Sequence, residues 1–116
     1  MKYLLILQIN AAALGELTEA EWAEVQAGHD EFRRIAEEAG EMISTQALAD
    51  PSTSIVVSSS GIRSGPFQHT SVGGYYLVDV DSKDRAIELA DLLPDTRIEG
   101  LAVEIRPVML PAGADY

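Results

Sequence analysis

A short, almost unbroken apolar segment near the N-terminus limits the folds open to this chain. Residues 3–9 are apolar except for Gln8, which is too short a run for a helix, and small residues follow it. The segment therefore predicts a buried strand. Its odd-numbered and even-numbered positions are both apolar, so we expect both faces of its sheet to be covered.

A long helix is predicted directly after this strand. Thr18 and Glu21 have the spacing of a capping box, and Gly40 can adopt the left-handed conformation that ends a helix. Between them, apolar residues recur at helical spacing: Trp22, Val25, Phe32, Ile35 and Ala39. We place this helix at about residues 19–39.

The remaining chain predicts four strands, one helix and one long loop. Two short strands at residues 42–48 and 54–59 are separated by the turn dipeptide Asp50-Pro51. Residues 61–74 contain four glycines and show no periodicity, so they predict a loop. A clear strand at residues 75–80, a helix between Asp81-Ser82 and Pro94, and a half-buried strand at residues 101–108 complete the pattern.

The elements follow the order βαβββαβ, which predicts an α+β fold with both helices on one face of a mostly antiparallel sheet. Residues 1–109 form a single domain in this interpretation, and residues 110–116 form a loose tail. Two helices cover only one sheet face, whereas the strands are apolar on both. We therefore expect a homodimer packed sheet to sheet.

The charge and composition of the chain exclude several classes of function. Eight basic and 19 acidic residues give a net charge of −11, which disfavours binding to nucleic acid or to anionic lipid. No apolar run approaches the roughly 20 residues of a membrane-spanning helix, and we expect no membrane partner. The absence of cysteine excludes disulfides and thiolate chemistry, and together with the lack of a signal peptide it predicts a cytoplasmic protein.

Two glycine-containing motifs resemble a known family. Residues 64–67 (Ser-Gly-Pro-Phe) and the strand that begins at Gly73-Gly74 are similar to the DGPF signature of the YCII-related family, and residues 1–6 and 103–108 extend the resemblance over nearly the whole chain. The resemblance implies a dimeric ferredoxin-like fold with a ligand pocket near the sheet. Activities in the family are mostly unassigned, and one branch includes a dehydrochlorinase of a chlorinated aromatic.

The chain departs from the family pattern at positions that bear on chemistry. Ser64 replaces the Asp of the signature, and the loop between Phe67 and the paired glycines is short. The wider family pairs a His of the first helix with an Asp near the end of the second. His29 matches that His, but Leu93 stands at the position of the Asp, which leaves Asp91 or Asp95 as substitutes.

His29 is the candidate catalytic residue. It lies between Val25 and Phe32 on the helix face directed at the sheet, where a histidine can act as general acid or base if a cavity admits a ligand. The alternative is a core histidine bonded to a backbone carbonyl.

Six further residues are candidate ligand-binding groups. They comprise loop residues near the signature and two strand tyrosines whose side chains point to opposite faces: Arg63, Ser64, Phe67, His69, Tyr75 and Tyr76. Arg63 can clamp an acidic ligand through its fork of donors. The alternatives are a solvated arginine, an exposed loop histidine, and tyrosines that only pack in the core.

The sequence indicates no metal and no cofactor. The two histidines lack a ligand spacing, and the glycine motifs match neither the Walker nor the dinucleotide fingerprint. Two functions remain: a cofactor-free lyase or isomerase that uses His29 on a small apolar or aromatic ligand, and a non-catalytic ligand-binding or regulatory dimer. A subunit that pairs with another protein is a third hypothesis.

Overall fold

The computed structural model describes residues 1–109, so the tail predicted at residues 110–116 lies outside the described residues. The helices are α1 (Ala11–Gly15), α2 (Glu19–Glu38) and α3 (Lys83–Asp91), with 3₁₀ turns η1 (Pro51–Thr53) and η2 (Pro94–Arg97). The strands are β1 (Lys2–Asn10), β2 (Met42–Ala47), β3 (Ile55–Ser58), β4 (Gly61–Ser64), β5 (Thr70–Asp79) and β6 (Leu101–Pro107).

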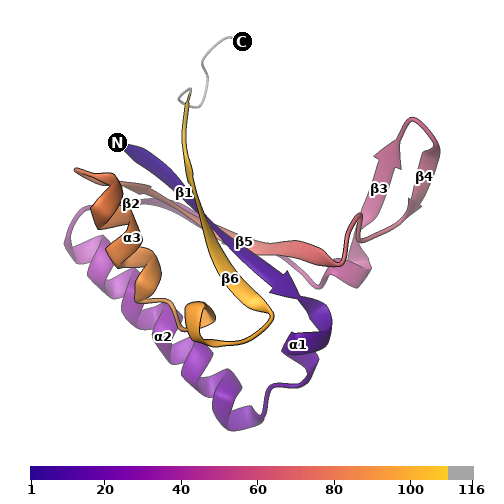
Figure 1. Ribbon diagram of the computed structural model, residues 1–116, viewed down its shortest axis with the longest axis horizontal. Coiled ribbons are helices and arrows are strands. Elements are labelled where there is room, and N and C mark those ends of the chain that lie inside the picture. Colours follow the sequence, from indigo (N-terminus) through magenta and orange to yellow (C-terminus); the bar gives the residue numbers. More distant parts are fainter. Residues whose placement is uncertain (110–116) are drawn as a thin grey trace.

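Four strands form an antiparallel sheet in the order β2-β5-β1-β6. The two main helices, α2 and α3, lie together on one side of this sheet (Figure 1). The predicted α+β class, with two main helices on one face of an antiparallel sheet, is therefore confirmed. The apolar strand β1 lies in the interior of the sheet, between β5 and β6. This position is typical of a strand that is apolar on both faces.

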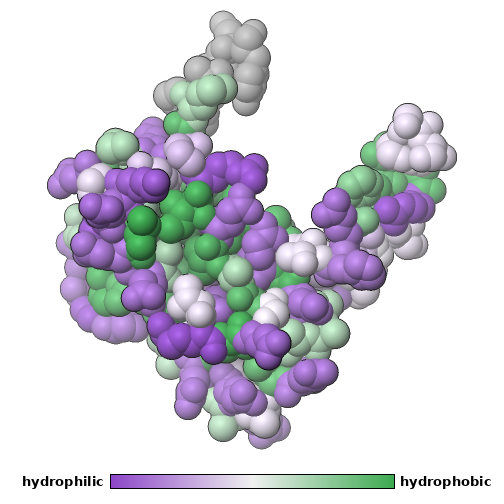
Figure 2. All heavy atoms as spheres, viewed as in Figure 1, coloured by the Kyte–Doolittle hydropathy of each residue, from purple (hydrophilic) through white to green (hydrophobic). Residues whose placement is uncertain are grey.

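The strand predicted at residues 54–59 does not join this sheet. Instead, β3 pairs with β4 in a separate hairpin that projects from the body of the molecule (Figure 1). Three of its large apolar side chains, Ile55, Val57 and Ile62, are 72–75% exposed. Figure 2 shows hydrophobic residues at the surface of this projecting hairpin.

The loop predicted at residues 61–74 is wrong in part, because it contains β4 and the first half of β5. Two of the four glycines that suggested a loop, Gly73 and Gly74, serve close packing within the sheet. A Cβ atom at Gly73 would lie 2.9 Å from Ile9, and one at Gly74 would lie 2.7 Å from the Gln46 carbonyl oxygen. The short helix α1 was also not predicted, since five residues are too few to show a helical period.

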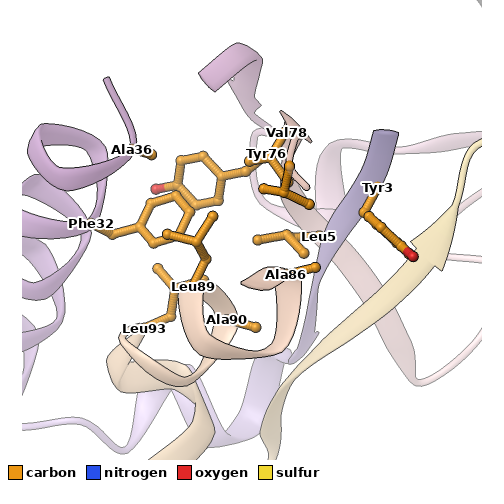
Figure 3. Close-up of a cluster of buried hydrophobic side chains, with 11 residues drawn as sticks. Tyr3, Leu5, Phe32, Ala36, Tyr76, Val78, Ala86, Leu89, Ala90 and Leu93 are labelled. Atoms are coloured by element: carbon orange, nitrogen blue, oxygen red, sulfur yellow. The ribbon is translucent and has the colours of Figure 1, made fainter. Parts of the chain in front are cut away.

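The core lies between the two main helices and the inner strands β1 and β5. Figure 3 shows Phe32 of α2 facing Tyr76 of β5, with Leu89 and Leu93 beside them. The Phe32 and Tyr76 ring centroids are 4.4 Å apart at an angle of 48°, a tilted arrangement that aromatic pairs favour. Phe32 is fully buried, so α2 is fixed to the sheet at this level.

Helix α2 begins and ends where its sequence signals predict. Thr18 Oγ1 accepts from the Glu21 amide at 3.1 Å, and Glu21 Oε1 accepts from the Thr18 amide at 3.0 Å. Gly40 adopts a positive φ of 70° after the helix. No helix within residues 1–109 is long and apolar enough to cross a membrane.

Replacement of Phe32 by alanine should destabilise the protein strongly. The change removes a fully buried ring from between α2 and the sheet, and a cavity of that size costs about 3–5 kcal/mol in the free energy of unfolding. Urea denaturation followed by circular dichroism measures the effect. Ile87→Ala at a 45% exposed position of α3 is the control, and an equal loss in both variants would contradict the assigned core.

Candidate functional site

Both ring nitrogens of His29 are engaged by side chains from other elements. Nε2 lies 2.6 Å from Asp95 Oδ1, and Nδ1 lies 2.7 Å from the Tyr76 hydroxyl oxygen. Asp95 is only 4% exposed, and it is the buried polar residue of the core. The structure thus joins α2, η2 and β5 through one imidazole.

Asp95, rather than Asp91, is the carboxylate that reaches His29. Leu93 is fully buried in the core, and Pro94 then starts the 3₁₀ turn η2, which directs Asp95 at α2. Asp91 remains exposed at the end of α3. Asp91 and Asp95 each lie two residues from Leu93 in the sequence. Spacing alone does not show which of the two carboxylates a short turn directs at His29.

A glycine next to His29 allows η2 to approach this closely. A Cβ atom at Gly28 would lie 2.6 Å from Cγ and 2.7 Å from Cδ of Pro94. Glycine in the middle of a helix costs about 1 kcal/mol relative to alanine. The close contact with Pro94 explains why glycine occupies this helix position. The sequence alone did not reveal this contact.

The protonation state of Tyr76 defines the hydrogen bonds of the imidazole. Burial raises the pKa of the Tyr76 hydroxyl, and the nearby positive charge of Arg33 acts in the opposite direction. The hydroxyl is therefore protonated at neutral pH. In the neutral form of His29, the Asp95 carboxylate accepts from Nε2–H, and Nδ1 accepts from the Tyr76 hydroxyl.

A cavity of about 400 Å³ opens onto this cluster from the region between α2, the end of β2 and η1. Its apolar wall includes Leu7, Ile9, Leu14, Trp22, Val25 and Leu48. Its polar or charged lining includes Gln26, His29, Arg33, Thr45, Tyr76 and Asp95. An apolar cavity of this size with a few convergent polar groups suits a small organic molecule.

Most of the predicted ligand-binding residues lie away from this cavity. Phe67 and His69 line a separate open hollow beside α1. Arg63 donates to the carbonyl oxygens of Ser64 at 2.9 Å and Pro66 at 3.3 Å, and its guanidinium lies 5.8 Å from the centre of the Phe67 ring. Arg63 and Ser64 thus belong to the base of the hairpin, where Arg63 holds the chain after β4.

The two tyrosines point to opposite sheet faces, as predicted. Tyr76 lies in the core and in the cavity, whereas Tyr75 pairs with Ile6 on the face without helices. Among the cavity residues that sequence reasoning missed, Arg33 is the positively charged one. Its position four residues after His29 on one helix was the available signal.

No group of three or more His, Cys, Asp or Glu side chains able to hold a metal ion occurs within residues 1–109. The imidazole of His29 is hydrogen-bonded to the carboxylate of Asp95 and to the phenol of Tyr76. This arrangement can hold and transfer a proton.

Replacement of Gly28 by alanine should disturb the site although alanine is the better helix former. The added methyl group would overlap Pro94 and push η2, with Asp95, away from His29. We expect the variant to lose about 1–3 kcal/mol in the free energy of unfolding. NMR of the imidazole NH protons should show a weakened Nε2–H hydrogen bond.

Gly15→Ala is the matched control, because a Cβ atom at that position meets no other atom within 4 Å. This control should keep both the stability and the imidazole NH signal of the wild type. A stabilised Gly28→Ala variant with an unchanged signal would contradict the role given to Gly28.

Comparison with descriptions of protein families gives a match for this chain. The family description of the YCII-related domain matches residues 1–110, which is nearly the whole chain. Comparison with curated proteins gave no match. The extent of the family match establishes that the chain belongs to the YCII-related family.

Proposed function

We propose that this YCII-related protein is a cofactor-free lyase or isomerase that transfers a proton at His29 on a small apolar or aromatic ligand. The observation that carries this proposal is that His29 borders a cavity while its Nε2 lies 2.6 Å from Oδ1 of the buried Asp95. A core histidine without access to a cavity would have argued against catalysis.

Asp95 prepares His29 to accept a proton. Its carboxylate fixes the tautomer with the proton on Nε2, and it stabilises the positive imidazolium that forms when Nδ1 takes up a second proton. The pair is nearly closed to solvent, where such an interaction is stronger than in water. This is the arrangement that a general acid or base requires.

Tyr76 connects Nδ1 with the ligand. Its hydroxyl can accept a proton from the ligand while its own proton passes to Nδ1, so that no free phenolate forms at any stage. The raised pKa of Tyr76 supports this relay, because burial disfavours a separate phenolate. The protonated His29 then returns the proton by the same path to another atom of the ligand, which completes an isomerisation or an elimination.

Proton exchange on an enolisable ketone tests this function directly. We expect the wild type to accelerate deuterium uptake at the benzylic carbon of phenylacetone in D₂O, measured by NMR. His29→Gln should lower this rate by about 10²–10⁴-fold, because it removes the base. Asp95→Asn should lower it as well, because the neutral amide no longer stabilises the imidazolium.

Asp91→Asn is the matched control, since Asp91 is an exposed acid four residues from Asp95. It should exchange at the wild-type rate. If phenylacetone binds at His29 and no exchange occurs, the catalytic role fails, and the non-catalytic ligand-binding dimer becomes the better function. The observation that favours this alternative is that both ring nitrogens are already bonded within the protein.

We also propose that two copies pack sheet to sheet in a ferredoxin-like dimer of the DGPF branch. In the register of β1 and β5, Leu4 lies opposite Leu77 and Ile6 lies opposite Tyr75. These four residues alternate with those of the core, so they share the face without helices. They form an apolar strip along β1 and β5, bordered on β6 by Arg106 and Glu104. An apolar strip that the helices leave uncovered favours a partner.

Leu77→Glu should convert the protein from a dimer to a monomer. A charge in the middle of the apolar sheet face would be buried without a partner in the dimer. Light scattering after size exclusion distinguishes a single 12.5 kDa chain from a pair. Ile87→Glu, on the exposed side of α3, should remain dimeric. A wild type that is already a folded monomer, or a dimer that both variants retain, would rule out this interface.

A further inference from the structure

Arg33 is the positively charged side chain of the cavity that contains His29. Since it follows His29 by four residues on α2, the two side chains project from the same helix face. Among the described residues that line the cavity there is no other lysine or arginine. Arg63, which the sequence suggested as a clamp for an acidic ligand, lies at the base of the hairpin instead.

We propose that the ligand carries a single carboxylate that binds to the Arg33 guanidinium, beside the point of proton transfer. The ligand class is then a small aromatic or unsaturated carboxylic acid whose apolar part fills the cavity. This inference rests on the proposed function for the position of the reacting atom, but carboxylate recognition itself depends only on Arg33.

The present partners of Arg33 leave it able to bind a ligand. Nη2 of Arg33 donates to Asp30, three residues earlier on α2. Asp30 has a side chain that is 69% exposed, and exposed ion pairs contribute little net stability. Arg33 also interacts with the Tyr76 hydroxyl through a side-chain hydrogen bond. A guanidinium has five N–H donors, so these two partners do not use them all. Donors therefore remain for a carboxylate, which accepts two of them in a planar pair.

The position of Arg33 relative to Tyr76 connects recognition with chemistry. Arg33 and Tyr76 line the same cavity, and the guanidinium acts against the effect of burial on the pKa of the Tyr76 hydroxyl. A negative charge that develops on the ligand near Tyr76 would therefore also interact with the guanidinium. Fixed positive charge at the site of a developing anion lowers the energy of the transition state.

The acidic surroundings restrict the charge of the ligand. Asp50 and Asp95 also line the cavity, Asp30 flanks Arg33, and the chain carries a net charge of −11. A polyanion would meet these carboxylates, whereas one carboxylate can be matched by one guanidinium. The local contact, rather than long-range attraction, must then select the ligand, because the field of the whole protein repels anions.

A pair of matched ligands tests the inference. Phenylpyruvate and phenylacetone are both benzyl ketones. Phenylpyruvate carries a carboxylate where phenylacetone carries a methyl group. Titration of the His29 ring signals by NMR gives the affinity for each. We expect the wild type to bind phenylpyruvate at least about tenfold more tightly, as expected for a charge-assisted hydrogen-bonded pair.

Variants of Arg33 and Arg34 show which arginine causes the preference for phenylpyruvate. Arg33→Gln should weaken phenylpyruvate binding by about tenfold or more and leave phenylacetone binding unchanged, while Arg33→Lys should restore part of the loss. Arg34→Gln is the control, because Arg34 pairs with Glu31 and Glu38 and does not line the cavity. It should behave as the wild type with both ligands.

Several outcomes would overturn the inference. They are a wild type that does not prefer phenylpyruvate, an Arg33→Gln variant that loses both ligands equally, and an Arg34→Gln variant that matches Arg33→Gln. Exchange of phenylacetone without any carboxylate preference would reject the inference alone. A preference that depends on Arg33 but is not accompanied by proton exchange supports carboxylate recognition and rejects only the catalytic role of His29.

Discussion

The hydrogen bond between His29 and Asp95 joins helix α2 to a turn 66 residues later in the chain. Burial of a carboxylate costs free energy unless its oxygens are hydrogen-bonded. Asp95 can therefore be buried only where it bonds to the His29 imidazole. The bond requires η2 to lie against the helix, which Gly28 permits because it has no side chain to meet Pro94. One glycine and one proline thus position the acid and the base of the site.

Tyr76 belongs both to the core and to the site. Its ring packs on Phe32 in the core, and its hydroxyl bonds to His29 at the wall of the cavity. The same side chain that fixes α2 on the sheet therefore also fixes the imidazole. A change in core packing at this level should affect the geometry of the site, since the interior transmits displacement through close contacts.

Two apolar surfaces of the chain are not covered by its own helices. One is the sheet face with Leu4 and Leu77, and the other is the projecting hairpin with Val57 and Ile62. A two-stranded hairpin alone is marginally stable in water. Both surfaces are consistent with the proposed pairing of two copies. The apolar residues named for them, Leu4, Leu77, Val57 and Ile62, do not line the cavity.

The sequence by itself determined the two main helices, the four strands of the sheet and the helix face that carries His29, because apolar periodicity and capping signals are local. The resemblance to the YCII-related family implied Asp91 or Asp95 as the partner of His29, with a backbone carbonyl as the alternative. Only the tertiary structure decided between them, placed β3 in a separate hairpin and put Arg33 rather than Arg63 in the cavity. These outcomes depend on contacts between residues far apart in the chain, such as Gly28 with Pro94. Local patterns do not encode such contacts, whose geometry is set when the helices close on the sheet.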